Sequence, residues 1–140
     1  MEIKPDDGPV RVEAACDADW KGCALTARST SGGVLKVAGT VVATFSQTQP
    51  GLPALSSGES ELRALTKTGI DTVGVENLCK DMGIGIDGQA RIWTDSTAAR
   101  QAGNRMGPGR MKHVEASDMY IQTLTKSGRL TVGKIAGDLN

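Results

Sequence analysis

The sequence predicts a single α/β domain built on a mixed β-sheet. The chain has 140 residues, the size of one domain, and no internal linker long enough to divide it. Short apolar runs that are typical of strands alternate with segments of helical periodicity. Two of these runs, 34–38 and 40–46, are separated only by Gly39, which predicts a tight hairpin within the sheet.

The first half of the chain predicts three strands after a polar segment. Residues 1–11 are interpreted as a leader or linker, because 1–9 are polar and contain two prolines. Residues 28–33 are expected to form a loop, since they are rich in Ser, Thr and Gly. Pro50 and Pro53 then take the chain out of the sheet. The predicted strands are 12–16, 34–38 and 40–46.

A long helix is predicted from Ser56 to about Met82. Ser56 and Glu59 have the spacing of a capping box, and Gly83 is a natural stop. Gly69 and Gly74 within this helix either allow close packing or break it. The remaining predicted elements are a strand at 90–94, a short helix at 96–102, a helix at 113–127 and a strand at 130–136.

Composition excludes several classes of protein. Lys and Arg number 16 and Asp and Glu number 16, so the whole surface is not a polycation, although a local basic patch is compatible. Four aromatic residues argue against a stacking platform for single-stranded nucleic acid. No run approaches the roughly 20 apolar residues of a membrane span, so no membrane partner is expected. The three cysteines make no C-x-x-C pair, which favours a reduced, intracellular setting.

Three carboxylates from distant segments are candidates for one metal site. Asp17 and Asp95 each follow a predicted strand, and Glu61 lies near the start of the long helix. If the two strands are parallel neighbours, these acids meet at one sheet edge, where α/β sheets build their sites. Carboxylates are the ligands that Mg²⁺ prefers, and two such ions about 4 Å apart can activate water at a phosphodiester.

Other interpretations of these acids stay open. An Asp after a strand is most often a helix cap or a turn residue, and Asp95 precedes a helix. Asp19 competes with Asp17, and Glu59 competes with Glu61. We assign Glu59 to the helix cap and Asp19 to the turn on local grounds, although spacing alone proves neither choice.

Several short motifs occur in an order typical of one family. They are Asp17-Ala18-Asp19-Trp20-Lys21-Gly22, Arg28-Ser29-Thr30-Ser31-Gly32, Leu55-Ser56-Ser57, Glu59-Ser60-Glu61, Thr94-Asp95-Ser96 and Lys112-His113-Val114. From about Val12 onward the chain resembles the ribonuclease H domain of copia-type retrotransposon polyproteins. No single motif is decisive, but their order and spacing together are specific.

The resemblance implies an RNase H-like fold, a five-stranded mixed sheet flanked by helices. It implies hydrolysis of the RNA strand of an RNA/DNA hybrid with two Mg²⁺ ions, for which Mn²⁺ can substitute. Asp17, Glu61 and Asp95 take the places of the catalytic, metal-binding acids. The family's fourth acid lies just after the last strand, beyond Asn140, so 12–140 is interpreted as a domain without its C-terminal end.

The resemblance also implies partners and a location. An adjoining reverse transcriptase domain is expected, in the cytoplasm or in a retroelement particle. Without the fourth acid, the alternative is a catalytically silent module of the same fold that binds a hybrid or a partner protein.

A basic stretch follows the second Asp. Residues 100–112 carry four cations and no acid, and the glycines there let backbone amides approach phosphates. A solvated, flexible loop is the competing interpretation. His113, the single histidine, is either a proton shuttle near the scissile phosphate or a structural residue. The candidate contacts to nucleic acid are Ser57, Ser60, Arg105, Arg110 and Lys112.

Overall fold

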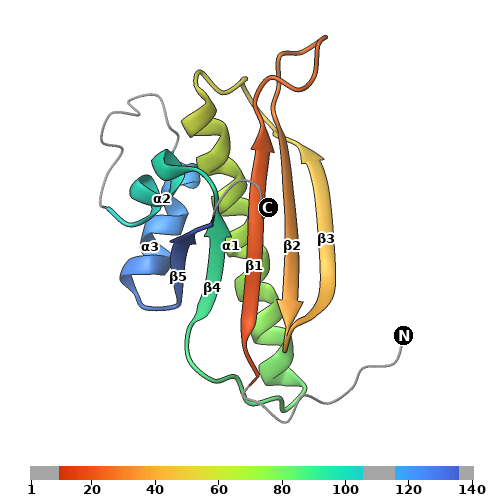
Figure 1. The fold of residues 1–140 in the computed structure, drawn as a ribbon, viewed down its shortest axis with the longest axis vertical. Helices are drawn as coiled ribbons and strands as arrows, with labels where there is room; N and C mark the ends of the chain where they lie inside the picture. The colour runs from red at the N-terminus through yellow and green to blue at the C-terminus, as the bar shows by residue number, and fades with distance from the viewer. Residues whose placement is uncertain (1–9, 106–115, 136–140) are drawn as a thin grey trace.

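A computed structural model describes residues 10–105 and 116–135, which form one sheet with helices packed against it (Figure 1). The predicted α/β class, with a five-stranded mixed sheet flanked by helices, is confirmed. In chain order the elements are β1 (Val12–Asp19), β2 (Thr30–Val37), β3 (Thr40–Thr48), α1 (Ser57–Asp81), β4 (Ala90–Thr94), α2 (Thr97–Gly103), a 3-10 helix η1 (Ala116–Met119), α3 (Tyr120–Lys126) and β5 (Leu130–Lys134).

The order of the strands across the sheet is β3-β2-β1-β4-β5. β1 and β2 pair antiparallel, as do β2 and β3, whereas β4 runs parallel to both β1 and β5. The carboxyl ends of β1 and β4 therefore lie at the same edge, at the top of Figure 1, where α1 begins. This edge is where an open α/β sheet offers a site.

The hairpin between β2 and β3 is confirmed, but the predicted loop at 28–33 is wrong from Thr30 onward. Ala38 and Gly39 both have positive φ, 50° and 78°, as a two-residue hairpin turn requires. β2 starts at Thr30 and pairs with both β1 and β3. Position 33 in this strand requires glycine, because a Cβ there would overlap the ring of Phe45.

The long helix α1 begins and ends as predicted. The Ser56 hydroxyl accepts a hydrogen bond from the Glu59 amide at 3.1 Å, and Gly83 beyond the last turn has φ 75°. Gly69 permits close packing, since a Cβ there would lie 2.8 Å from Cδ1 of Ile121 in α3. Gly74 faces open space, and the helix continues through it.

The core lies between the sheet and the three helices. α1 runs along one face of the sheet, and α2 and α3 lie beside it near β5 (Figure 1). Alternate side chains of β1 point to this face, which is why Val12, Ala14 and Cys16 are buried. The core is lean in large side chains; its fully buried members include Leu35, Leu62, Leu65, Ile92 and Ile121.

The C-terminal elements are shorter than predicted. In place of one helix over 113–127, the described residues form η1 and then α3, while 113–115 lie outside the described part of the chain. β5 ends at Lys134, before the predicted end at residue 136. At the other end, Val10 and Arg11 of the predicted leader are tied to the domain by their carbonyls, which accept from Asp87 and Ala38. Among the described helices, none is long and apolar enough to cross a membrane.

Candidate active site

Three carboxylates from three elements meet at the carboxyl edge of the sheet. Asp17 lies near the end of β1, Glu61 near the start of α1, and Asp95 directly after β4. One carboxylate oxygen of each lies within 4.8 Å of the corresponding oxygens of the other two. Asp17 is exposed and the other two are partly exposed, so the cluster opens to solvent.

The strand register brings the two aspartates together. Cys16 and Thr94 are partners in the parallel pair of β1 and β4. Each is followed by an aspartate, so Asp17 and Asp95 lie at the same level along the two strands. The N-terminal end of α1 adds Glu61 to the same place, and the Ala18 backbone amide donates a hydrogen bond to Oδ1 of Asp17 at 2.9 Å. The convergence expected from the sequence is present.

Asp95 does not serve as a helix cap. The residue after it, Ser96, caps α2 by accepting from the Ala99 amide at 3.1 Å. The Ser96 amide in turn donates to the Thr94 hydroxyl at 3.1 Å. The local polar groups are thus satisfied by Ser and Thr, which leaves the carboxylate of Asp95 to face Asp17 and Glu61.

The two competing acids have structural roles, as their local patterns indicated. Glu59 is buried; it accepts from the Leu55 amide at 3.0 Å and from the Arg63 guanidinium at 2.8 Å. Asp19 is the last residue of β1, and its carbonyl accepts from the Gly22 amide at 3.3 Å in the turn that follows. Neither belongs to the carboxylate cluster.

The cluster has the electrostatics of a cation site. Two effects raise the pKa of Glu61 to about 8. Burial is the larger, and the negative charges of Asp17 and Asp95 add to it. The Oε2 atom of Glu61 is buried and accepts no hydrogen bond from the described residues. A divalent cation would compensate both the crowded charge and this unpaired oxygen, so the donor set fits a hard, oxygen-seeking metal.

The thiol beneath the cluster is inert. Cys16 is 1% exposed, and its burial, with the nearby charge of Glu61 as the next cause, raises its pKa to about 12. A thiol in this state is neither a nucleophile nor a metal ligand at neutral pH.

The proposed nucleic-acid contacts have different outcomes. Ser57 is exposed in the first turn of α1, beside the cluster. Ser60 is fully buried, and its hydroxyl donates to the Ser57 carbonyl at 2.8 Å rather than facing solvent. Arg105 lies just after α2 and is partly exposed. The remaining candidates, Arg110, Lys112 and His113, lie outside the described residues.

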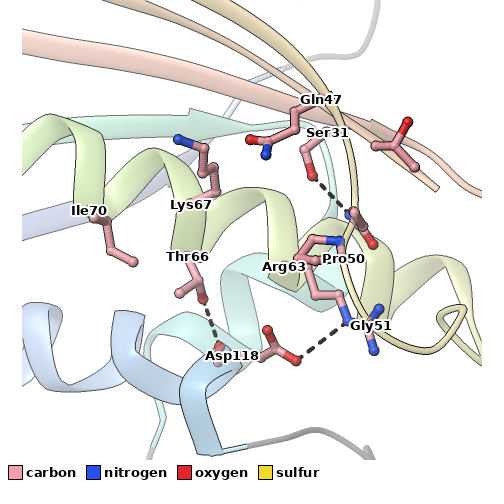
Figure 2. Close-up of a pocket in the computed structure, with 11 residues that line it drawn as sticks. Ser31, Gln47, Pro50, Gly51, Arg63, Thr66, Lys67, Ile70 and Asp118 are labelled. Atoms are coloured by element: carbon pink, nitrogen blue, oxygen red, sulfur yellow. Dashed lines mark hydrogen bonds and ion pairs between the residues drawn. The ribbon is translucent and has the colours of Figure 1, made fainter. Parts of the chain in front are cut away.

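A groove of about 460 Å³ that no sequence pattern indicates lies along α1, between the end of β3 and η1 (Figure 2). Its cations are already paired: Arg63 lies 3.4 Å from the Asp118 carboxylate, and Lys67 lies 2.8 Å from Asp71. The Thr66 hydroxyl also donates to the Asp118 carbonyl at 2.7 Å. The contacts of Arg63 and Thr66 with Asp118 join α1 to η1, and no local pattern links Thr66 to Asp118, which lies 52 positions away.

Comparison with known proteins identifies the fold. No protein-family model matches the sequence, and no curated protein matches it. LC11-RNase H1, isolated from compost by a metagenomic approach, is similar in structure with a TM-score of 0.64 at 13% identity, over 93% of this chain and 87% of that one. The N-terminal RNase H domain of Rv2228c from Mycobacterium tuberculosis gives 0.58 at 19% identity, over 92% and 86%.

The chain has the RNase H fold. Two further structures agree: LC11-RNase H1 in complex with an RNA/DNA hybrid has a TM-score of 0.56 at 14% identity, over 93% of this chain and 88% of that one. The prototype foamy virus protease-reverse transcriptase has 0.51 at 14% identity, over 95% of this chain but 18% of that one. In this RNase H fold the carboxylate cluster lies at the sheet edge where β1 and β4 end.

Proposed function

We propose that this chain is a ribonuclease H that hydrolyses the RNA strand of RNA/DNA hybrids with the help of divalent metal ions. The observation that carries the proposal is the meeting of Asp17, Glu61 and Asp95 within 4.8 Å at the open edge of the sheet. The RNase H fold supports it, and so does the structurally similar LC11-RNase H1, which has been captured with such a hybrid.

Asp17, Glu61 and Asp95 would hold Mg²⁺, or Mn²⁺ in its place. When bound, such ions polarise the phosphoryl oxygens, activate water and stabilise the leaving oxygen of a phosphodiester. The protein supplies a rigid frame: two of the ligands are fixed by strand register and the third by a capped helix. The exposed hydroxyl of Ser57 lies at the same end of α1 and is proposed to contact the nucleic acid.

We also propose a retroelement context, with a reverse transcriptase adjoining this domain inside the cell. The motif order shared with copia-type polyproteins supports this proposal. The foamy-virus similarity is compatible with it, because that structure is a protease-reverse transcriptase of which the matched part is 18%. Such a tether would supply the attraction for nucleic acid that a net charge of zero does not.

The proposal is tested by incubating the chain with an end-labelled RNA/DNA hybrid and Mg²⁺, beside single-stranded RNA and duplex DNA. Cleavage of the RNA in the hybrid alone, lost in Glu61→Gln and in Asp95→Asn, is the expected result. Asp19→Asn is the matched control, since it removes an acid at the same sheet edge that is outside the cluster, and it should keep the activity.

A catalytically silent, hybrid-binding module is the second candidate. The family that the chain resembles has a fourth acid in its site. The cluster contains three carboxylates within the described residues, and this difference favours the silent module. Tight binding of the hybrid without cleavage under Mg²⁺ and Mn²⁺ would support this candidate, whereas failure to bind any hybrid would exclude both.

A further inference from the structure

An exposed tryptophan lies three residues after Asp17, the carboxylate that β1 contributes to the cluster. Trp20 follows the last residue of β1, and 40% of its surface is exposed although it is one of four aromatic residues in the chain. Two residues earlier, the Ala18 amide donates to the Asp17 carboxylate of the cluster at 2.9 Å. The tryptophan is therefore held on the segment that carries Asp17, just past the edge where that acid lies.

The ring of Trp20 is fixed in its exposed position. Its indole Nε1 donates to the Ala54 carbonyl at 3.1 Å, which joins the β1–β2 loop to the segment before α1. The Lys21 ammonium lies 4.8 Å from the centroid of the ring. An aromatic ring held this firmly in a loop contributes contact area at little entropic cost when a partner binds.

The backbone at Lys21 is held in the turn that follows β1. Lys21 has φ 56°, and the Gly22 amide donates to the Asp19 carbonyl across the turn. The buried hydroxyl of Ser29 accepts from the Lys21 amide at 3.0 Å, which anchors this turn to the domain. The position of Lys21 next to Trp20 is therefore fixed.

We propose that Trp20 and Lys21 form a nucleotide-contact platform, on which a sugar or base of the bound hybrid packs while the ammonium faces a neighbouring phosphate. The inference rests on the proposed function, since it concerns the same substrate at the same sheet edge. The proposal concerns a single aromatic residue against an RNA/DNA hybrid, whereas the expectation from composition concerned a platform of several rings for single-stranded nucleic acid.

Charge favours nucleic acid over a protein as the occupant. The cluster alone presents three acids to an incoming polyanion, and a cation at its margin offsets part of that repulsion. An aromatic ring combined with a cation is the pairing that nucleic-acid grooves use for base or sugar and phosphate together.

The test measures hybrid affinity with Ca²⁺ in place of Mg²⁺, so that binding is separated from cleavage. Trp20→Ala is expected to weaken binding about five- to thirtyfold, and Trp20→Phe to weaken it less. Leu78→Ala is the matched control: it removes a large exposed side chain near the far end of α1, and it should leave binding unchanged.

Two further measurements address stacking and charge. In a Trp93→Phe background Trp20 is the single tryptophan, so its emission should change when hybrid is added. Lys21→Asn removes the charge but suits a left-handed backbone, and it should lower the salt dependence of log Kd by about one. Thermal melts confirm that each variant is folded.

The outcomes separate the two proposals. Hybrid cleavage by the wild type, with unchanged affinity in folded Trp20 variants and no change in Trp20 emission on adding hybrid to the Trp93→Phe protein, would overturn the platform and leave the ribonuclease intact. If Trp20→Ala instead converts a self-associated wild type to a monomer at unchanged hybrid affinity, the ring is a protein contact and the inference is wrong. A wild type without affinity for hybrid would overturn both proposals.

Discussion

Cys16 and Thr94 lie opposite each other in the parallel strands β1 and β4, and each is followed by an aspartate. Register alone therefore places two carboxylates side by side at the sheet edge. Glu61 enters the same space from α1, and its neighbours determine its charge state. The first predictions follow from this arrangement.

The metal-free protein should lose stability as the pH rises from about 5 to about 9. The pKa of Glu61 in the fold is about 8, above its ordinary 4.5, so ionisation opposes folding. The destabilisation is absent below the lower value, grows between the two and is complete above the higher. Glu61→Gln removes it, and in EDTA this variant should be more stable than the wild type by about 1–2 kcal/mol at the alkaline end, after allowance for solvent screening.

Thermal or urea unfolding across this pH range is the measurement. The two proteins should converge at the acidic end, where Glu61 is protonated in both states. A difference in the free energy of unfolding that stays constant with pH would show that the pKa of Glu61 is not raised in the folded protein. Added Mg²⁺ should stabilise the wild type and leave the variant almost unchanged.

Metal binding should release protons at neutral pH. Because the pKa of Glu61 is about 8, this carboxyl is mostly protonated in the metal-free site and must ionise to become a ligand. Calorimetry of Mg²⁺ binding in two buffers of different ionisation enthalpy should reveal the release of close to one proton near pH 7. The apparent affinity should rise up to about tenfold per pH unit below this pKa. Buffer-independent heats would contradict the prediction.

The sequence could predict those features that depend on local chemistry. α1 begins at a capping box and ends at a glycine, and both signals lie within one turn of the helix end. The local pattern also assigns Glu59 to the cap, and its hydrogen bonds with Leu55 and Ser56 at the start of α1 confirm that assignment. The parallel pairing that joins Asp17 to Asp95 could be given only as a condition, since no local pattern encodes which strands become neighbours.

Features that depend on distant residues were missed or wrong. Gly33 lies in a strand and is covered by the ring of Phe45, which leaves no room for a Cβ. Composition cannot reveal this contact, so the sequence predicts a loop at this glycine. Ser60 is at the helix start, as expected, but the Gln49 amide donates to its carbonyl at 2.7 Å and closes it off from solvent. Composition shows that Trp20 is one of four aromatic residues, whereas its proposed role depends on the Ala54 carbonyl that holds its ring, 34 positions away.

The three cysteines should differ in the rate at which their thiols react. Cys23 is partly exposed, and hydrogen bonds from Thr26, chiefly from its hydroxyl, lower its pKa, so it should react first. Cys79 is buried, and Cys16 is buried with a pKa of about 12. A disulfide-exchange reagent at mildly alkaline pH should therefore label one thiol quickly and the other two only on unfolding. Cys23→Ser should abolish the fast phase; rapid labelling of Cys16 would contradict its burial beneath the cluster.

The two glycines of α1 should respond in opposite ways to the same substitution. Gly74→Ala should stabilise the protein by about 1 kcal/mol, since nothing lies within 4 Å of the new methyl group and alanine favours the helix. Gly69→Ala gains the same propensity, but its methyl group would lie 2.8 Å from Ile121 and 3.3 Å from Leu124, both buried. We expect a net loss of about 1–2 kcal/mol, because the ends of these two buried side chains must shift within the packed core. Urea unfolding of the pair checks this, and equal stabilisation by both would show that α3 does not pack on Gly69.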